Sequence, residues 1–126
     1  MDKVISSLLN EVVITFPIQP PKSQARPYAS YESQTYDEAK SFEGYLTKTN
    51  IRYEVSVISD SVAESKELYI ELRNKIKSVE RTTQGGIYIE RVTLDNNAPE
   101  FWENEIKAYR KILNFEISYQ GGTHGS

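Results

Sequence analysis

The stretch GGIYIERVTLDNNAPEFWENEIKAYRKILNFEISY, residues 85–119, decides the fold of this chain. Its first and last thirds alternate apolar and polar residues, which is typical of half-buried strands. The middle is mostly polar, and it contains one aromatic pair and a proline. We therefore predict a strand at 87–95, a loop at 96–108 and a strand at 109–119.

The first of these strands changes phase along its length. Ile87 and Ile89 fall on one side of it, whereas Val92 and Leu94 fall on the other. A β-bulge near Glu90 would bring both pairs onto the same face of the sheet. Without a bulge, the strand is apolar on both sides at different points.

Two upstream elements can partner these strands. Residues 45–59 alternate in the same way, which predicts a strand with one buried face. Residues 61–79 predict a long amphipathic helix, in which Ser61 and Glu64 form a capping box. The apolar stripe of this helix comprises Val62, Leu68, Tyr69, Leu72, Ile76 and Val79.

The N-terminal third is less regular. Apolar residues at helical spacing predict a short helix at 2–13, and four prolines make 17–27 an extended connection. Residues 27–34 are typical of an edge strand. Residues 34–44 leave two interpretations open: a helical turn capped by Thr35, or the irregular start of a long hairpin arm.

The predicted order of elements is α-β-β-α-β-β. This order is typical of an α+β fold with a mostly antiparallel β-sheet of about four strands, packed by the long amphipathic helix and the short N-terminal helix. A chain of 126 residues can bury a core of its own. We therefore expect a single α+β domain at 1–120 and a flexible C-terminal tail at 121–126.

The composition argues against most chemistries. The chain has no cysteine, which excludes disulfides, thiolate metal sites and a cysteine nucleophile. A catalytic or metal-binding histidine must be held beside its partners, but the one histidine, His124, lies in the glycine-rich tail. The net charge of −3 argues against nonspecific nucleic-acid binding. No apolar run approaches the roughly 20 residues of a membrane-spanning helix.

Carboxylates gather in the predicted loop, where paired acids could serve acid–base chemistry or bind a cation. The loop lacks the spacing of a calcium-binding loop, and nothing in the sequence indicates a walled cleft around it. We therefore predict a solvated acidic loop in a protein that is not an enzyme and has no catalytic, cofactor-binding or metal site. The acids are Asp95, Glu100, Glu103 and Glu105.

The segment PEFW at 99–102 stands out within this loop. It places the single tryptophan of the chain beside a phenylalanine. Tryptophan is enriched at the centres of protein interfaces. Packing of the two rings in the protein's own core and packing between subunits both remain open.

Four segments carry a family resemblance through their order and spacing. They are the strand IRYEVSVIS, the helix AESKELYIELRNKIKSV, the strand GGIYIERVTLDN with the loop after it, and the strand YRKILNFEISY. Together they resemble the tail-terminator, or tail-completion, proteins of long-tailed bacteriophages, a class of minor tail and head-tail joining proteins. The upstream segment PYASYES is similar to the first strand of that family.

The resemblance implies an α+β fold and a closed ring, commonly a hexamer, that caps the tail tube and joins it to the head-neck region. The implied partners are the chain itself, the tail-tube protein and a head-completion or neck protein. DNA would pass through the lumen without sequence-specific binding, and no membrane is involved. The implied location is the head-proximal end of the tail in the virion, after assembly in the host cytoplasm.

A closed ring of identical subunits needs two different contact patches on each subunit. Position and surface chemistry favour the acidic loop for one patch and the solvent side of the long helix for the other. Residues 35–48 would form an arm toward the tail tube or the neck. The subunit-interface candidates are Ile70, Pro99, Phe101, Trp102 and Glu103.

Two other functional interpretations remain open. One is a small oligomeric α+β ligand-binding or regulatory protein without catalysis, which predicts a defined apolar pocket. The other is an enzyme that uses the acidic loop, which predicts a carboxylate in a cleft with a raised pKa.

Overall fold

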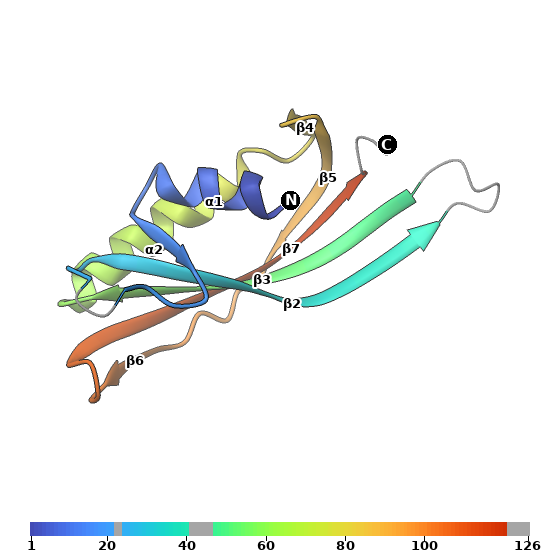
Figure 1. Cartoon of the computed structure of the whole chain (residues 1–126). Coiled ribbons are helices and arrows are strands. Elements are labelled where there is room, and N and C mark those ends of the chain that lie inside the picture. Colours follow the sequence, from blue (N-terminus) through green and yellow to red (C-terminus); the bar gives the residue numbers. More distant parts are fainter. Residues whose placement is uncertain (22–23, 41–46, 121–126) are drawn as a thin grey trace.

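The computed structural model describes residues 1–21, 24–40 and 47–120 of the chain. Helices α1 and α2 pack against each other on one face of a long, curved sheet (Figure 1). The elements in chain order are α1 (Asp2–Asn10), β1 (Thr15–Pro17), β2 (Tyr28–Lys40), β3 (Thr47–Ser59), α2 (Val62–Lys77), β4 (Thr82–Gln84), β5 (Ile87–Leu94), β6 (Glu100–Glu103) and β7 (Ala108–Gln120).

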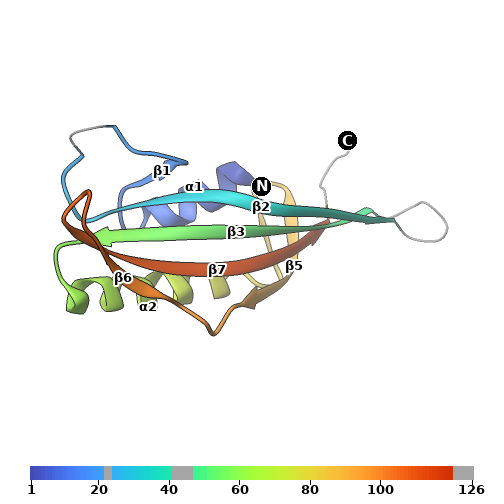
Figure 2. The ribbon, with the colours of Figure 1, turned by 90° about the horizontal axis from the view of Figure 1, so that it is seen from below.

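The strands form one mixed sheet in the order β1-β2-β3-β7-β5-β4, and β6 also pairs with β7. β1 runs parallel to β2, whereas the other pairs are antiparallel. β3 occupies one edge of β7 from Tyr109 to Gln120, so β5 and β6 must share the other edge. β6 therefore continues the line of β5 along β7 (Figure 2).

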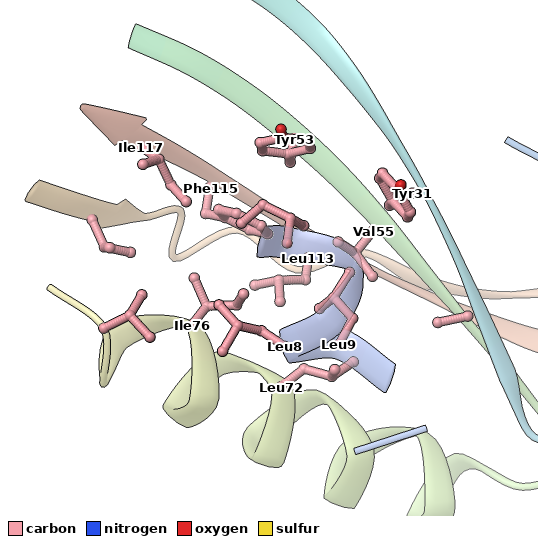
Figure 3. Close-up of a cluster of buried hydrophobic side chains, with 14 of the residues drawn as sticks. Leu8, Leu9, Tyr31, Tyr53, Val55, Leu72, Ile76, Leu113, Phe115 and Ile117 are labelled. Atoms are coloured by element: carbon pink, nitrogen blue, oxygen red, sulfur yellow. The ribbon is translucent and has the colours of Figure 1, made fainter. Parts of the chain in front are cut away.

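The hydrophobic core lies between the helices and the sheet (Figure 3). Tyr53 of β3 stacks on Phe115 of β7 with ring centroids 5.5 Å apart, and Leu72 and Ile76 of α2 are fully buried beneath them. The Tyr53 hydroxyl donates to Asp2 Oδ1 at 2.5 Å, which ties the start of α1 to the sheet. Burial and this hydrogen bond raise the pKa of Tyr53.

The predicted fold class is wrong in the number and direction of the strands. A seven-stranded mixed sheet replaces the expected four antiparallel strands. The sequence does not reveal β1, β4 and β6, which have three or four residues each. Such segments are too short to show a period of two, and their pairing partners determine them.

β1 lies between the predicted helix at 2–13 and the predicted connection at 17–27. α1 ends at Asn10 rather than at residue 13, and the Asn10 side chain accepts a hydrogen bond from Thr15 N–H at 2.9 Å. This contact closes the turn between the helix and β1. β1 is thus an edge strand that overlaps the predicted connection only at Pro17.

The predicted bulge near Glu90 is confirmed. The register of β5 on β7 shifts between Ile89 and Arg91 and leaves Glu90 as the extra residue. Ile89 and Val92, which are 0% and 1% exposed, consequently both face the core. The predicted N-cap of the long helix is also confirmed, because Ser61 accepts a hydrogen bond from the backbone of residue 64 at 3.1 Å.

Of the two interpretations left open for residues 34–44, the hairpin arm is correct as far as Lys40. β2 continues to Lys40 and pairs with β3 from Thr47 onward, with a register shift between Ser33 and Thr35. Residues 41–46, part of the predicted arm, lie outside the described residues. The predicted tail at 121–126 lies outside them as well.

Candidate assembly surface

β6 and β5 form one interrupted strand along the edge of β7. Asp95 N–H donates to Asn114 C=O at 2.9 Å, and Ile112 N–H donates to Pro99 C=O at 2.9 Å. Residues 96–98 loop out between these two hydrogen bonds. The predicted loop at 96–108 is therefore mostly strand and turn, which is a further correction to the sequence interpretation.

An ion pair locks β6 to β7. Arg110 donates to both carboxylate oxygens of Glu103, at 2.5 Å and 3.2 Å. These hydrogen bonds hold the pKa of Glu103 below its usual range. The turn between the strands contains Lys107 in the left-handed region with φ 54°, and its Nζ lies 3.2 Å from Asn104 Oδ1. β6 is thus one arm of a tight hairpin.

A largely buried lysine anchors the same strand from the helix side. Lys111 Nζ donates to Ala98 C=O at 3.2 Å and lies 3.7 Å from Glu100 Oε1. It also lies 4.8 Å from the centre of the Tyr69 ring on α2, within the range of a cation–π contact. On the same flank of α2, Arg73 donates to Asp95 C=O at 3.3 Å. The helix layer therefore fixes the position of β6.

The two aromatic rings of β6 are held at the margin of the sheet and stay half exposed. Trp102 makes an edge-to-face contact with Tyr109 at 5.0 Å, yet 48% of it is exposed. Phe101 is 44% exposed. Because neighbouring residues of a strand point to opposite faces, Phe101 lies on the open face of the sheet with Arg110, and Trp102 lies on the helix face. Packing in the protein's own core accounts for only part of each ring.

The predicted interface candidates separate into two groups. Pro99, Phe101, Trp102 and Glu103 share one margin of the sheet, although the Glu103 carboxylate is already engaged by Arg110. Ile70 is 55% exposed but lies on α2, in the helix layer. Ile70 and the β6 residues therefore lie on different elements of the structure.

Sequence reasoning missed two exposed apolar residues at the opposite margin. Ile14 and Ile18 flank β1 and are 48% and 71% exposed. Ile18 also adopts a positive φ of 63°, which is unusual for a β-branched residue. The available signal was the apolar run from Val12 to Phe16 and the single isoleucine Ile18 in the proline-rich segment 17–27, which we interpreted only as an extended connection.

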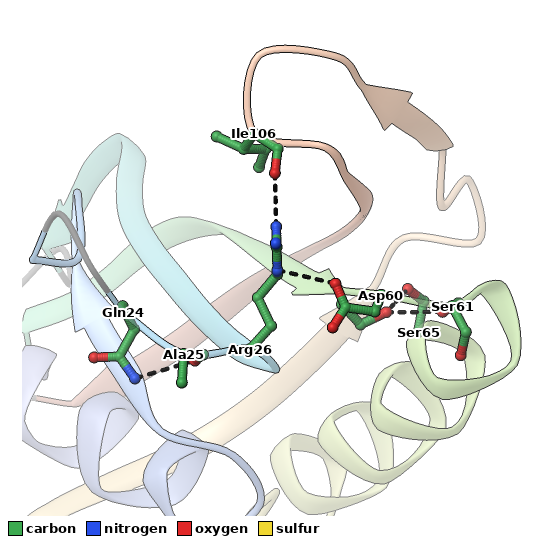
Figure 4. A network of polar contacts seen from close by, with 8 residues as sticks. Gln24, Ala25, Arg26, Asp60, Ser61, Ser65 and Ile106 are labelled. Atoms are coloured by element: carbon green, nitrogen blue, oxygen red, sulfur yellow. Dashed lines mark hydrogen bonds and ion pairs between the residues drawn. The ribbon is translucent and has the colours of Figure 1, made fainter.

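A groove of about 380 Å³ lies between the proline-rich segment and the β6–β7 turn. The Arg26 guanidinium donates at 2.6 Å to the C=O of Ile106, which lines the groove, and pairs with Asp60 at 3.0 Å (Figure 4). Tyr28 and Ile58 contribute to its lining. The Arg26 contacts fix the proline-rich segment to the hairpin that carries β6.

Away from this groove, the open face of the sheet carries polar residues, some of which pair across strands. Arg52 contacts Glu116 at 3.3 Å and Asp95 at 3.5 Å, and Ser118 donates to Asn50 at 2.5 Å. Within the described residues, no group of acids and histidines has the arrangement of a metal site. Neither α1 nor α2 is long and apolar enough to span a membrane.

Comparison with known proteins finds a similar fold in a solved virion structure. No protein-family profile matches the chain, and no curated protein matches it. Among solved structures, a chain from the virion of a native gene transfer agent particle is similar, with a TM-score of 0.63 and 18% sequence identity. The match covers 94% of this chain and 85% of that chain. At this identity, the likeness shows that the two chains share a fold.

Proposed function

We propose that this chain is a structural virion protein of a phage-like particle and, more specifically, that it forms the tail-terminator ring between the tail tube and the neck. The observation that carries the proposal is the shared fold with a virion chain over nearly the full length of both proteins. The sequence resemblance to tail-terminator proteins supports the finer assignment. In this role the protein is not an enzyme and needs no cofactor.

The distribution of exposed apolar side chains supports self-assembly. Exposed aromatic and aliphatic residues stand on β6 and beside β1, on opposite sides of β2, β3 and β7. Two different patches on one subunit permit a heterologous contact, which closes into a ring when the rotation between copies closes. Six copies is the number that the resemblance implies.

The polar face of the sheet suits the lumen of such a ring. It carries charges of both signs, and Arg52 pairs across strands with Glu116 and Asp95, although Glu32 and Glu54 stand opposite each other. Paired charges leave little potential to hold or repel a DNA backbone. We propose that this face lines the channel through which DNA passes.

The long hairpin of β2 and β3 supports a contact along the ring axis. Its described part extends past the helix layer (Figure 1). We propose that this hairpin contacts the tail-tube protein or the neck protein, as expected for the predicted arm at 35–48.

Mass measurement and imaging test the proposal. Multi-angle light scattering should give a mass several times that of the monomer, either for the protein alone at high concentration or after addition of tail-tube protein. Negative-stain images of the same samples should contain rings. A strict monomer under both conditions would contradict the proposed function.

The groove between the proline-rich segment and the β6–β7 turn favours one other function, a ligand-binding or regulatory protein. Its volume of about 380 Å³ falls within the range of small-molecule sites. In that case Ile58→Trp, which fills the groove, should abolish ligand binding and leave the oligomeric state unchanged. A ring that forms equally well with this substitution and without any ligand would disfavour the alternative.

A further inference from the structure

We infer that Ile14 and Ile18 beside β1 form the surface that receives Phe101 and Trp102 of the next copy of the chain. We call these pairs the β1 patch and the β6 patch. The inference rests on the proposed ring and names the two surfaces that close it. It also removes Ile70 from that contact.

The two patches lie on opposite sides of β2, β3 and β7, across the groove that Ile18 and Glu103 both line (Figure 2). A contact between the β1 patch of one copy and the β6 patch of the next is heterologous, because each copy offers one patch to each neighbour. Such a contact can be repeated from subunit to subunit until the ring closes.

The patches also lie at the same level along the strands. One line of cross-strand neighbours runs from β6 to β2 through Phe101, Arg110, Ile58 and Tyr28. Thr15 pairs with Ala29, so Ile14 stands beside Tyr28 at the end of this line. Strand alternation puts Ile14 and Phe101 on the same open face. A contact between equal levels adds no displacement along the strands, as a closed ring rather than a helical filament requires.

The backbone of β1 indicates that the contact uses side chains and not an added strand. Asn10 accepts from Thr15 N–H at 2.9 Å, and its amide nitrogen lies 3.5 Å from Thr15 C=O. Pro17 has no N–H, and its C=O accepts from Gln19 N–H at 2.7 Å. Strand addition needs donors and acceptors along the edge, and here they are occupied.

The chemistry of the β1 patch fits the aromatic rings of the β6 patch. Ile14 and Ile18 stand beside Phe16, Pro17 and Gln19 in the sequence. The charged residues of the groove that Ile18 lines, Glu103 and Arg110, are paired with each other. Aromatic anchors bind best in apolar surfaces from which water is excluded. A second copy supplies such anchors from Phe101 and Trp102, each nearly half exposed.

Ile70 lacks these features. Its neighbours one helical turn away are Lys66, Glu67, Arg73 and Asn74, which are all polar. A single exposed apolar side chain among polar ones is common on protein surfaces and needs no partner. We therefore exclude Ile70 from the subunit contact.

Cysteine cross-linking tests the inference directly, because the natural chain has no cysteine. Ile14→Cys and Phe101→Cys are prepared as separate proteins and treated with a short bismaleimide, alone and as an equal mixture. We expect covalent dimers in the mixture only, and a ladder up to the ring size when one chain carries both substitutions. The matched control combines Ile70→Cys with Phe101→Cys and should give no ladder.

Two outcomes of the cross-linking would overturn the inference. Dimers of Phe101→Cys alone would indicate an isologous contact between two β6 patches. A ladder with the Ile70 pair, and none with the Ile14 pair, would assign the second patch to α2.

A charge swap provides an independent variant pair. Ile14→Lys and Phe101→Glu should each weaken association at least about tenfold, and the two substitutions together should restore most of it. Ile70→Lys should leave association within about twofold of the natural chain. Thermal unfolding of each variant confirms that the subunit remains folded. Failure of the combined substitutions to restore association would count against the inference.

Light scattering on the same samples separates the two levels of the proposal. Rings that form without a cross-link between Ile14→Cys and Phe101→Cys would refute the assigned patches and leave the proposed function intact. A strict monomer, with or without tail-tube protein, would refute both.

Discussion

Replacing Lys111 with methionine tests whether β6 is fixed from beneath, as a rigid assembly surface requires. Lys111 Nζ is 3.2 Å from Ala98 C=O and 3.7 Å from Glu100 Oε1. Glu100 Oε1 has no hydrogen-bond partner among the described residues, so this lysine is its main electrostatic support. Lys111→Met keeps most of the aliphatic stem and removes the charge.

The expected loss follows from the burial of the pair. The Lys111 and Glu100 side chains are only 11% and 19% exposed. Removing one partner of a fully buried ion pair costs about 3–5 kcal/mol, and a hydrogen bond such as that to Ala98 contributes about 1 kcal/mol more. Because the Glu100 carboxylate retains some access to water, we expect the free energy of unfolding to fall by about 2–4 kcal/mol.

Urea denaturation and amide hydrogen exchange measure this loss. With a slope of about 1–3 kcal/mol/M, the unfolding midpoint should fall by roughly 1–2 M. Exchange at Ile112 N–H, which donates to Pro99 C=O, should accelerate in Lys111→Met. The matched control is Lys107→Met in the exposed β6–β7 turn, which should change stability by less than about 0.5 kcal/mol.

A second variant isolates the role of the uncompensated carboxylate. Adding Glu100→Gln to Lys111→Met should recover at least about 1 kcal/mol, because an amide is easier to bury than an unpaired charge. The reasoning is refuted if Lys111→Met behaves like Lys107→Met, or if the added Glu100→Gln destabilises the protein further.

Three other predictions concern stability. Arg110 lowers the pKa of Glu103, so this pair stabilises the fold above the ordinary glutamate pKa of about 4.3, and the stabilisation is lost as pH falls through the folded-state pKa. Glu103→Gln should therefore flatten the acid side of a plot of melting temperature against pH. An unchanged slope would contradict this. Tyr53→Phe and Asp2→Ala should show a coupling free energy of about 1–2 kcal/mol in a double-mutant cycle by urea denaturation, whereas simple additivity would argue against the hydrogen bond. Ser61→Ala should cost about 1 kcal/mol in thermal unfolding and Ser61→Asp much less, and equal losses would rule out a capping role.

The long elements could be predicted because their patterns extend over many residues. The stripe of α2 spans several helical turns, and the alternation of β3 has one phase throughout its apolar part. The bulge at Glu90 followed from the same logic, since only an extra residue reconciles Ile89 with Val92. In each case a slip of one residue would expose an apolar side chain, so the sequence determines the register.

β6 could not be predicted from periodicity, because four residues cannot establish a period. It is a strand because β7 offers an edge and the charges match across the hairpin: Glu100 stands opposite Lys111, and Glu103 lies diagonal to Arg110. Acids before a four-residue turn and bases after it were visible in the sequence as a cross-strand pattern. We predicted a solvated loop from the same acids because we considered their negative charge and not the positive charge of Lys111 and Arg110 on the next strand.

Differences among the sheet edges argue that the exposure at β6 has a purpose. Glu80 accepts from Val92 N–H at 2.9 Å and Lys77 donates to Val92 C=O at 2.8 Å, so two side chains cover the outer edge of β5. Asn10 covers β1 in the same way. Such covers prevent unwanted pairing between sheets. Within the described residues, no side chain covers the outward backbone of Trp102 on β6. β6 thus combines an uncovered edge with two exposed aromatic rings, which is the combination expected where another subunit provides the cover.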